Sequence, residues 1–216
     1  MQGLLALNGC FFSPQPNFAV KPTPTSSACR FPACCALRRG LPVALGSAYM
    51  NGFNCTTCGR FHDELPMCLG ASAPELYARI PEQERSTRVD LTSDQCVIDE
   101  KHFFVLGRIL IPVLGSSEPF AWLCWVSLSE SNFLRACELW HTEGRESEAP
   151  YFAWVQSDFP YEPTTLSLKA NLITMPLGER PIVELQACEH PLYIEQRNGI
   201  TFERVQQIVE AALHGL

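Results

Sequence analysis

The sequence lacks any run of about 18 apolar residues, the length that a membrane-spanning helix requires. Charge is also scarce, at 18% of the 216 residues, whereas 46% of the residues are hydrophobic. A chain so rich in apolar side chains can fill a core and does not have the composition of a disordered protein. We therefore expect a soluble globular protein without a membrane partner.

Basic residues are few and unevenly distributed. The first 49 residues contain four of the 16 lysines and arginines and none of the 23 acidic residues, so residues 50–216 carry 12 cations against 23 carboxylates. Nucleic-acid binding requires clustered cations, and no basic stripe occurs in this acidic part. We therefore expect no nucleic-acid partner.

Residues 1–49 also lack a sustained helical or strand pattern, and they contain six prolines. No charged residue precedes the short apolar tract at 4–7, which is unlike a secretory signal. A lipoprotein cleavage box ending at Cys10 and an organelle transit peptide are the alternatives. We expect residues 1–49 to be a disordered tail or a stretch translated from a misplaced start, and residues 50–216 to form one domain beginning at Met50.

The eleven cysteines do not indicate a disulfide framework. Seven of them lie in residues 50–216, an odd number, and Cys124, Cys137 and Cys188 occur within apolar or periodic segments. Free buried thiols are typical of a reducing compartment. We therefore expect a cytoplasmic protein.

Alternating patterns predict most of the sheet. Residues 120–128 have apolar side chains on both faces, which indicates a central strand. Residues 96–98 and 103–113 predict a hairpin, with Gly107 as a candidate bulge. Further strands are expected at 151–156, 165–171 and 182–187, the last two forming another hairpin.

Caps and helical periodicity predict the helices. Ser129 and Thr201 are the expected N-caps of two amphipathic helices, and shorter peripheral helices are expected to start near Pro74 and Pro81. The predicted fold class is α+β: a mostly antiparallel sheet with helices on one face and an N-terminal CxxC knuckle.

The motif with the clearest chemistry is C-x-x-C-G at residues 55–59. Two thiolates two residues apart can hold one tetrahedral ion, and Gly59 permits the left-handed turn behind them. A four-ligand zinc site needs two further donors. His62 could complete a local knuckle, and Cys96 could be brought in from the sheet. The predicted zinc ligands are Cys55, Cys58, His62 and Cys96.

A redox-active cysteine pair is the alternative. Thioredoxin-like cysteines lie between a strand and the helix that follows it. No strand is predicted before Cys55, and Gly59 follows Cys58 directly. We therefore favour metal binding, with zinc as the cofactor.

The other polar residues do not form a complete catalytic set. Asp94, Asp99 and His102 lie within nine residues and could serve acid–base chemistry, but no nucleophile or phosphate-binding loop accompanies them. His190 belongs to a polar cluster before the last helix that could line a cleft. Nine large aromatic rings in the middle of the chain are hard to bury fully, so some could form the floor of a groove.

Five motifs in series carry a resemblance to a known family. In order they are CTTCGRFHDELP, SDQCVIDEKHFF, WVSLSESNF, PYFAW and HPLYIEQRNGIT. Together they resemble the bacterial family called domain of unknown function 2199, from about Cys55 to about His214. The resemblance implies no mechanism, but the matching positions suggest a candidate cleft: Asp94, Asp99, His102, Trp125, His190 and Gln196.

The leading hypothesis is a small zinc-stabilised cytoplasmic binding or regulatory module with an unknown protein or small-molecule partner. A metal-dependent hydrolase that uses residues 94–102 or His190 is one alternative. An immunity-type protein whose acidic surface covers a basic partner is another. Coordination separates the first two, because structural zinc is closed by four protein ligands whereas catalytic zinc keeps one position for water.

Overall fold

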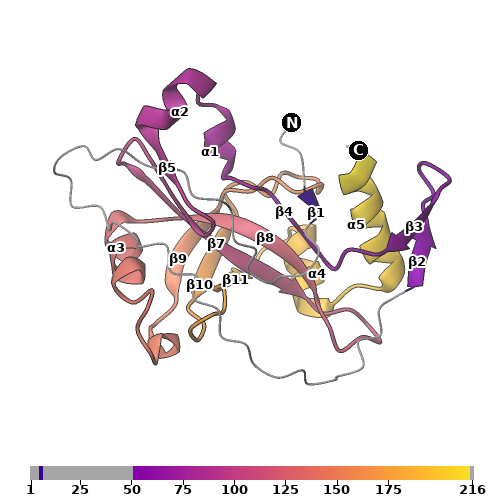
Figure 1. The fold of residues 1–216 in the computed structure, drawn as a ribbon. Helices are drawn as coiled ribbons and strands as arrows, with labels where there is room; N and C mark the ends of the chain where they lie inside the picture. Colours follow the sequence, from indigo (N-terminus) through magenta and orange to yellow (C-terminus); the bar gives the residue numbers. More distant parts are fainter. Residues whose placement is uncertain (1–4, 7–50, 215–216) are drawn as a thin grey trace, which may run out of the picture.

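The computed structural model describes residues 5–6 and 51–214, and it contains both helices and strands (Figure 1). The predicted α+β class agrees with this content. The expectations for residues 1–4 and 7–49 lie outside the described residues.

Five strands close into a barrel at the centre of the molecule. The strands are β7 (His102–Ile111), β8 (Phe120–Leu128), β9 (Tyr151–Val155), β10 (Lys169–Ile173) and β11 (Ile182–Leu185). Neighbours from β7 through β8, β9 and β10 to β11 are antiparallel, and β11 pairs in parallel with β7 at Ile182↔Arg108 to close the ring. The sequence predicted a sheet without closure, whereas five strands form a closed barrel, which removes two exposed strand edges.

Closure depends on a close approach of β11 to β7 at Gly107. A Cβ atom at this position would lie 2.7 Å from Val183 Cγ2 and 3.0 Å from Pro181 O. The β7–β8 register runs unbroken through Gly107↔Cys124, so the predicted bulge is wrong. The missing side chain instead makes room for the neighbouring strand.

Short strands extend the sheet on both sides of the barrel. They are β4 (Cys68–Gly70), parallel to β8, β1 (Leu5–Ala6), antiparallel to β4, and on the other side β6 (Gln95–Ile98) and β5 (Val89–Leu91). The register between β6 and β7 confirms the predicted hairpin. The pairing of β1 with β4 also attaches two of the first 49 residues to the sheet.

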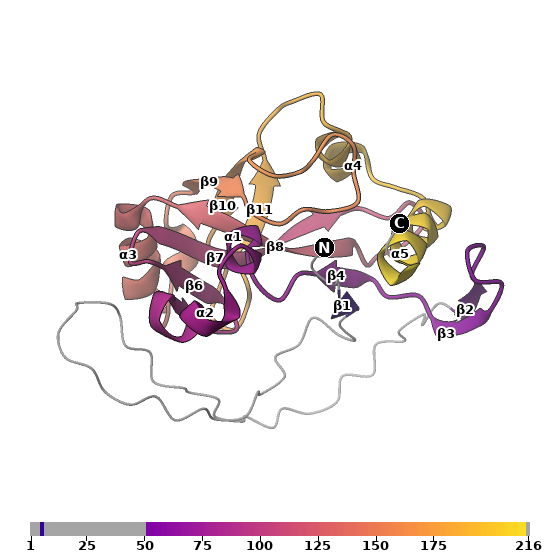
Figure 2. The ribbon, with the colours of Figure 1, turned by 90° about the horizontal axis from the view of Figure 1, so that it is seen from above.

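Helices lie around the barrel rather than on one face (Figures 1 and 2). They are α1 (Glu75–Ala78), α2 (Glu82–Arg88), α3 (Glu130–Glu138), α4 (Pro191–Asn198) and α5 (Phe202–His214), with a short 3-10 helix at Arg145–Ser147. The predicted cap of α3 is confirmed, because Asn132 N donates to Ser129 Oγ at 3.3 Å. Helix α4 was not predicted.

Strand β8 separates two apolar clusters, as expected for a central strand. Trp122 and Cys124 face the larger cluster, which includes buried residues of α5. Leu123 and Trp125 face the smaller one, which includes Cys96 of β6. Both faces of β8 are therefore core, and the alternation in the sequence correctly predicted this.

The predicted strand at 165–171 is partly wrong. Strand β10 begins only at Lys169, and Ser167 has a left-handed φ of 63°, which breaks an extended strand. Thr165 is fully buried, and its hydroxyl accepts from Phe159 N and donates to Ser157 O. These side-chain bonds fix a turn where the sequence alternates as a strand does.

Candidate metal centre

The C-x-x-C-G motif forms the turn of a β-hairpin. Strand β2 (Asn51–Asn54) precedes the turn and β3 (Phe61–Glu64) follows it. Cys55 N donates to Arg60 O, Gly59 N donates to Cys55 O, and Gly59 has a φ of 68°. The expectation that no strand precedes the motif is wrong, because two short polar strands that pair only with each other leave little hydrophobic pattern.

Three potential metal ligands of the hairpin meet a fourth from α5. The Sγ atoms of Cys55 and Cys58 and one ring nitrogen each of His62 and His214 all lie within 4.8 Å of one another. Cys55 Sγ is 3.1 Å from His214 Nε2, and Cys58 Sγ is 3.5 Å from His62 Nε2. Donor atoms of a tetrahedral zinc ion, with bonds of about 2.0–2.3 Å, are about 3.3–3.8 Å apart. The group could therefore hold a metal ion.

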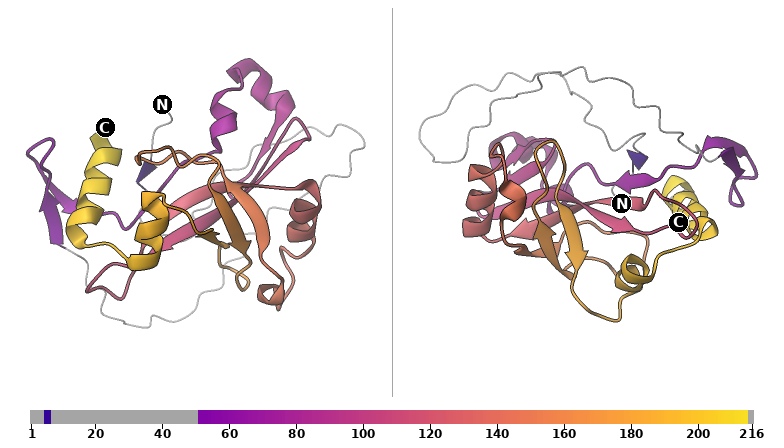
Figure 3. Two further views of the ribbon diagram at one scale, coloured as in Figure 1. Left: turned by 180° about the vertical axis from the view of Figure 1, so that it is seen from behind. Right: turned by 90° about the horizontal axis from the view of Figure 1, so that it is seen from below.

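Helix α5 positions His214 by packing its apolar face on the barrel. Val205, Ile208 and Val209 are buried in the larger core cluster. The hydroxyl of Thr201 accepts from Arg204 N at 3.3 Å, which agrees with the predicted start of the helix. Figure 3 shows α5 beside the β2–β3 hairpin from behind. A helix anchored in the core thus presents its last residue to the turn.

Glu210 holds the turn against α5 through hydrogen bonds. Its carboxylate accepts from Thr56 N at 2.9 Å, from Thr56 Oγ1, and from Gln206 Nε2 at 2.7 Å. Gln206 also donates to Asn54 O at 3.0 Å. Burial opposes ionisation, but these hydrogen bonds and nearby His214 outweigh it and hold the pKa of Glu210 below its usual range. These hydrogen bonds therefore hold the turn with Cys55 and Cys58 against the helix that carries His214.

A family model described as an uncharacterized protein conserved in bacteria (DUF2199) matches residues 54–200. The chain belongs to this family. The match to DUF2199 includes Cys55, Cys58 and His62, whereas His214 lies beyond it. Neither the curated proteins nor the solved structures that were searched gave a match. Every helix in the described residues is too short or too polar to cross a membrane.

Cys96, the fourth predicted ligand, does not lie with the other three in this DUF2199 domain. It is fully buried in β6, within the smaller core cluster. Burial, with a smaller contribution from Asp90, raises the pKa of its thiol to about 12. His214 takes the fourth place in the ligand group. The sequence carries no local signal for this, because Cys55 and His214 are 159 residues apart.

The acidic residues of the predicted cleft make separate ion pairs. Asp94 is buried and accepts from Arg180 Nε at 2.6 Å. Both carboxylate oxygens of Asp99 accept from Arg88, at 2.7 and 2.6 Å. His102 lies near them in sequence but is exposed, at the start of β7. The two carboxylates are thus each paired with a different arginine, while His102 is close enough to Asp99 to lower the pKa of that carboxyl slightly.

The other three cleft candidates are also tied into the fold. Trp125 is 1% exposed, and its Nε1 donates to Ala71 O. His190 is the N-cap of α4, accepting from Leu192 N at its Nδ1 atom. Gln196 bonds to the main chain of β11. Each of these three side chains therefore makes contacts that hold neighbouring segments of the fold together.

Proposed function

We propose that the protein is a small binding module in which a zinc ion fixes the N-terminal hairpin to helix α5. The observation that carries this proposal is the close group of Cys55, Cys58, His62 and His214. Two thiolates and two imidazoles are the donor set that zinc prefers in a tetrahedral site. Zinc bound there would close a knuckle formed by the hairpin and the end of α5.

The ligand number favours a structural zinc over a catalytic one. Four protein donors fill a tetrahedral shell and leave no position for a reactive water. The carboxylate of Glu210, which is bonded to the motif residue Thr56, already accepts hydrogen bonds at both oxygens, from Thr56 and Gln206. Asp94 and Asp99 are held by arginines elsewhere. These contacts argue against the hydrolase alternative.

We also propose a reducing compartment such as the cytoplasm. Cys55, Cys58, Cys96, Cys124 and Cys188 are free thiols, and three of them are buried. A zinc site with two thiolates also requires reduced cysteines. Mild oxidation of the purified protein should release the metal, which would agree with a protein that works in a reducing compartment.

The direct test is the metal content of protein purified under reducing conditions without chelator. We expect about one zinc per chain in the wild type. Cys55→Ser, Cys58→Ser, His62→Ala and His214→Ala should each weaken zinc binding by at least about tenfold in a competition titration with a coloured chelator.

Two matched controls make the test specific. Cys188→Ser removes an exposed thiol outside the group and should leave zinc content unchanged. Cys96→Ala should also retain zinc, since Cys96 is buried in the smaller core cluster. Loss of zinc in Cys96→Ala but not in His214→Ala would restore the ligand set predicted from the sequence. A metal-free wild type that is fully folded would refute the zinc site.

A further inference from the structure

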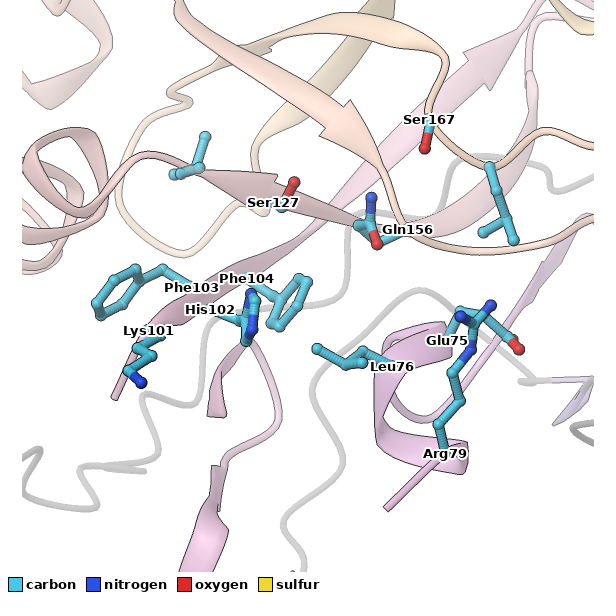
Figure 4. A pocket seen from close by; sticks show the side chains of 12 residues that line it. Glu75, Leu76, Arg79, Lys101, His102, Phe103, Phe104, Ser127, Gln156 and Ser167 are labelled. Carbon is cyan, nitrogen blue, oxygen red and sulfur yellow. The ribbon is translucent and has the colours of Figure 1, made fainter. Parts of the chain in front are cut away.

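The domain also has a hollow, well away from the hairpin, that has the size of a small-molecule site. Its volume is about 410 Å³, within the range of ligand pockets, roughly 300–1,000 Å³. It lies between α1, the start of β7, the end of β8 and the loop before β10 (Figure 4). Figures 1 and 2 show α1 well separated from the β2–β3 hairpin, which lies at one end of the molecule.

Apolar side chains form part of the wall of the hollow, although polar groups make up more of its accessible lining. Phe104 and Leu128 are 2% and 8% exposed and belong to the packed core. Leu76 of α1 and Leu166 add partly buried apolar surface. A ligand that enters the hollow can therefore bury a hydrophobic or aromatic part against these side chains.

The rim of the hollow is cationic, although the chain as a whole carries a net charge of −7. Arg79 extends from α1, and Lys101 and His102 lie on the opposite side (Figure 4). Within the residues that the structure describes, neither Arg79 nor Lys101 makes an ion pair. Two cations thus lie at the rim without an ion pair, although the ammonium of Lys101 points away from the other lining side chains in Figure 4 and interacts electrostatically with Asp99.

The nearby carboxylates do not cancel this charge. Asp99, next to the Lys101 turn, is already neutralised by Arg88 through two hydrogen bonds. Glu75 lies on α1 with Arg79 and opposes an anionic ligand from one side only. Hydrogen-bonding groups of Ser127 and Gln156 complete the wall. The balance favours a ligand with a negative group.

We propose that this hollow binds a small organic anion with an apolar or aromatic part. The apolar part of the wall would contact the hydrophobic part, and Arg79 and Lys101, on opposite sides of the rim, would attract the anionic group electrostatically. The inference gives the binding module of the proposed function a ligand class, but it does not depend on the zinc ion.

The test uses the fluorescent naphthalene sulfonate ANS, which has an aromatic body and one negative charge. We expect saturable binding to the full wild-type chain, and a Kd raised about tenfold in the Arg79→Gln, Lys101→Gln double variant. Glu75→Gln should lower the Kd, because it removes the opposing carboxylate. N-phenylnaphthylamine, an uncharged probe with a similar aromatic body, should bind the wild type and the double variant equally well.

The matched control is Lys169→Gln. Lys169 lies over the exposed ring of Trp154, on the outer face of β9 and β10, where an aromatic anion could also bind. This variant should bind ANS like the wild type. Weaker binding in Lys169→Gln with unchanged binding in the double variant would overturn the proposal and assign the site to that face.

A second readout separates this inference from the zinc proposal. Removal of zinc with a chelator should leave the Kd for ANS unchanged, since the hairpin lies well apart from α1 in both views of Figures 1 and 2. Equal ANS binding in the wild type and the double variant would refute the hollow as an anion site whatever the metal content.

Discussion

At the scale of single residues, Arg145 is the polar side chain with the most extensive main-chain bonding in the described residues. It is 5% exposed, and burial lowers the pKa of its guanidinium. The group donates to four carbonyl oxygens, those of Trp140, Met175, Pro176 and Glu179. Arg145 therefore joins the segment after α3 to the turn between β10 and β11.

We expect Arg145→Ala to lower the free energy of unfolding by about 3–5 kcal/mol, because it leaves several buried carbonyls without donors. Arg145→Lys should recover only part of this loss, since an ammonium cannot reproduce the planar fork. Urea denaturation measures both. Arg197→Ala, an exposed arginine paired with Glu184, should cost less than about 1 kcal/mol. A similar loss in the two alanine variants would contradict this role of Arg145.

Asp99 combines a charge with an unusual backbone conformation. Its φ of 54° is left-handed, and its carboxylate accepts two hydrogen bonds from Arg88. Hydrogen bonding by Arg88 is the main cause that holds the pKa of Asp99 below its usual value. A carboxyl with a lowered folded-state pKa stabilises the fold above its unfolded pKa, and this contribution is lost as pH falls through the folded value.

We therefore predict that Asp99→Asn is less stable than the wild type at neutral pH and that the difference disappears in acid. Asparagine tolerates the left-handed conformation, so this variant isolates the charge. Asp99→Ala should be less stable still, at every pH, because alanine adds backbone strain. Thermal melts between pH 7 and strongly acidic pH measure this. If the stability difference between the wild type and Asp99→Asn instead increased as the pH fell, Asp99 would not stabilise the fold through its charge.

At the scale of elements, the side chain of Gln196 joins α4 to the edge of β11. Its oxygen accepts from Leu185 N, and its amide nitrogen donates to Val183 O, both at 2.9 Å. The pair of bonds resembles those of a neighbouring strand. Strand β11 pairs with β7 at only one position, so this amide satisfies main-chain groups at the end of the barrel.

Gln196→Glu keeps the acceptor but loses the donor, and we expect it to lower the free energy of unfolding by about 1–3 kcal/mol. Gln196→Ala loses both bonds and should cost at least as much. The Kd for ANS should not change in either variant, because Gln196 does not line the hollow. If a Gln196 variant bound ANS more weakly but kept the free energy of unfolding of the wild type, Gln196 would have a ligand-binding role instead.

Local patterns in the sequence predicted most elements, and non-local contacts explain the failures. Strand β8 was predicted because its apolar alternation is local, and α3 was predicted from its Ser129 cap. The barrel was not predicted, since its closure depends on the contact of Gly107 with Val183. Helix α4 was missed because Leu192 is its one buried residue, and a single buried position gives no helical hydrophobic pattern.

The candidate site shows the same division. The motif alone indicated Cys55, Cys58 and His62, whose spacing along the chain is short. The fourth predicted ligand, Cys96, was chosen as a cysteine preceding an apolar strand, which is also the pattern of a core cysteine. His214 could be identified only once α5 was known to pack beside the hairpin.

At the scale of the whole molecule, the hairpin has its own two-stranded sheet, while Phe53 and Cys55 pack in the larger core cluster beside the barrel. The hairpin strands pair with each other and not with the larger sheet. The barrel has its own core on both faces of β8. Because the main-chain hydrogen bonds of the hairpin are separate from those of the barrel, metal loss should affect mainly the hairpin and the end of α5.

We predict that chelation of zinc speeds hydrogen exchange in residues 51–64 and in the last turn of α5, while β7 and β8 stay protected. A site loaded at 1,000 times its Kd adds about 4 kcal/mol to the stability of the structure that it holds. Hydrogen exchange measured by mass spectrometry, with and without chelator, reports separately on the hairpin, the end of α5 and the barrel strands. Uniform deprotection of the barrel would show that the metal supports the whole fold.

The separation of Cys55 from His214 has a consequence for synthesis. The ribosome makes the three hairpin donors early, and His214 emerges 159 residues after Cys55. A nascent chain can thus offer at most an incomplete shell, which binds zinc weakly. If the proposed zinc site forms, tight metal binding requires α5 to be made and docked, so a chain cut before His214 should differ from the full chain by a hairpin with free thiols that is more easily cleaved by proteases.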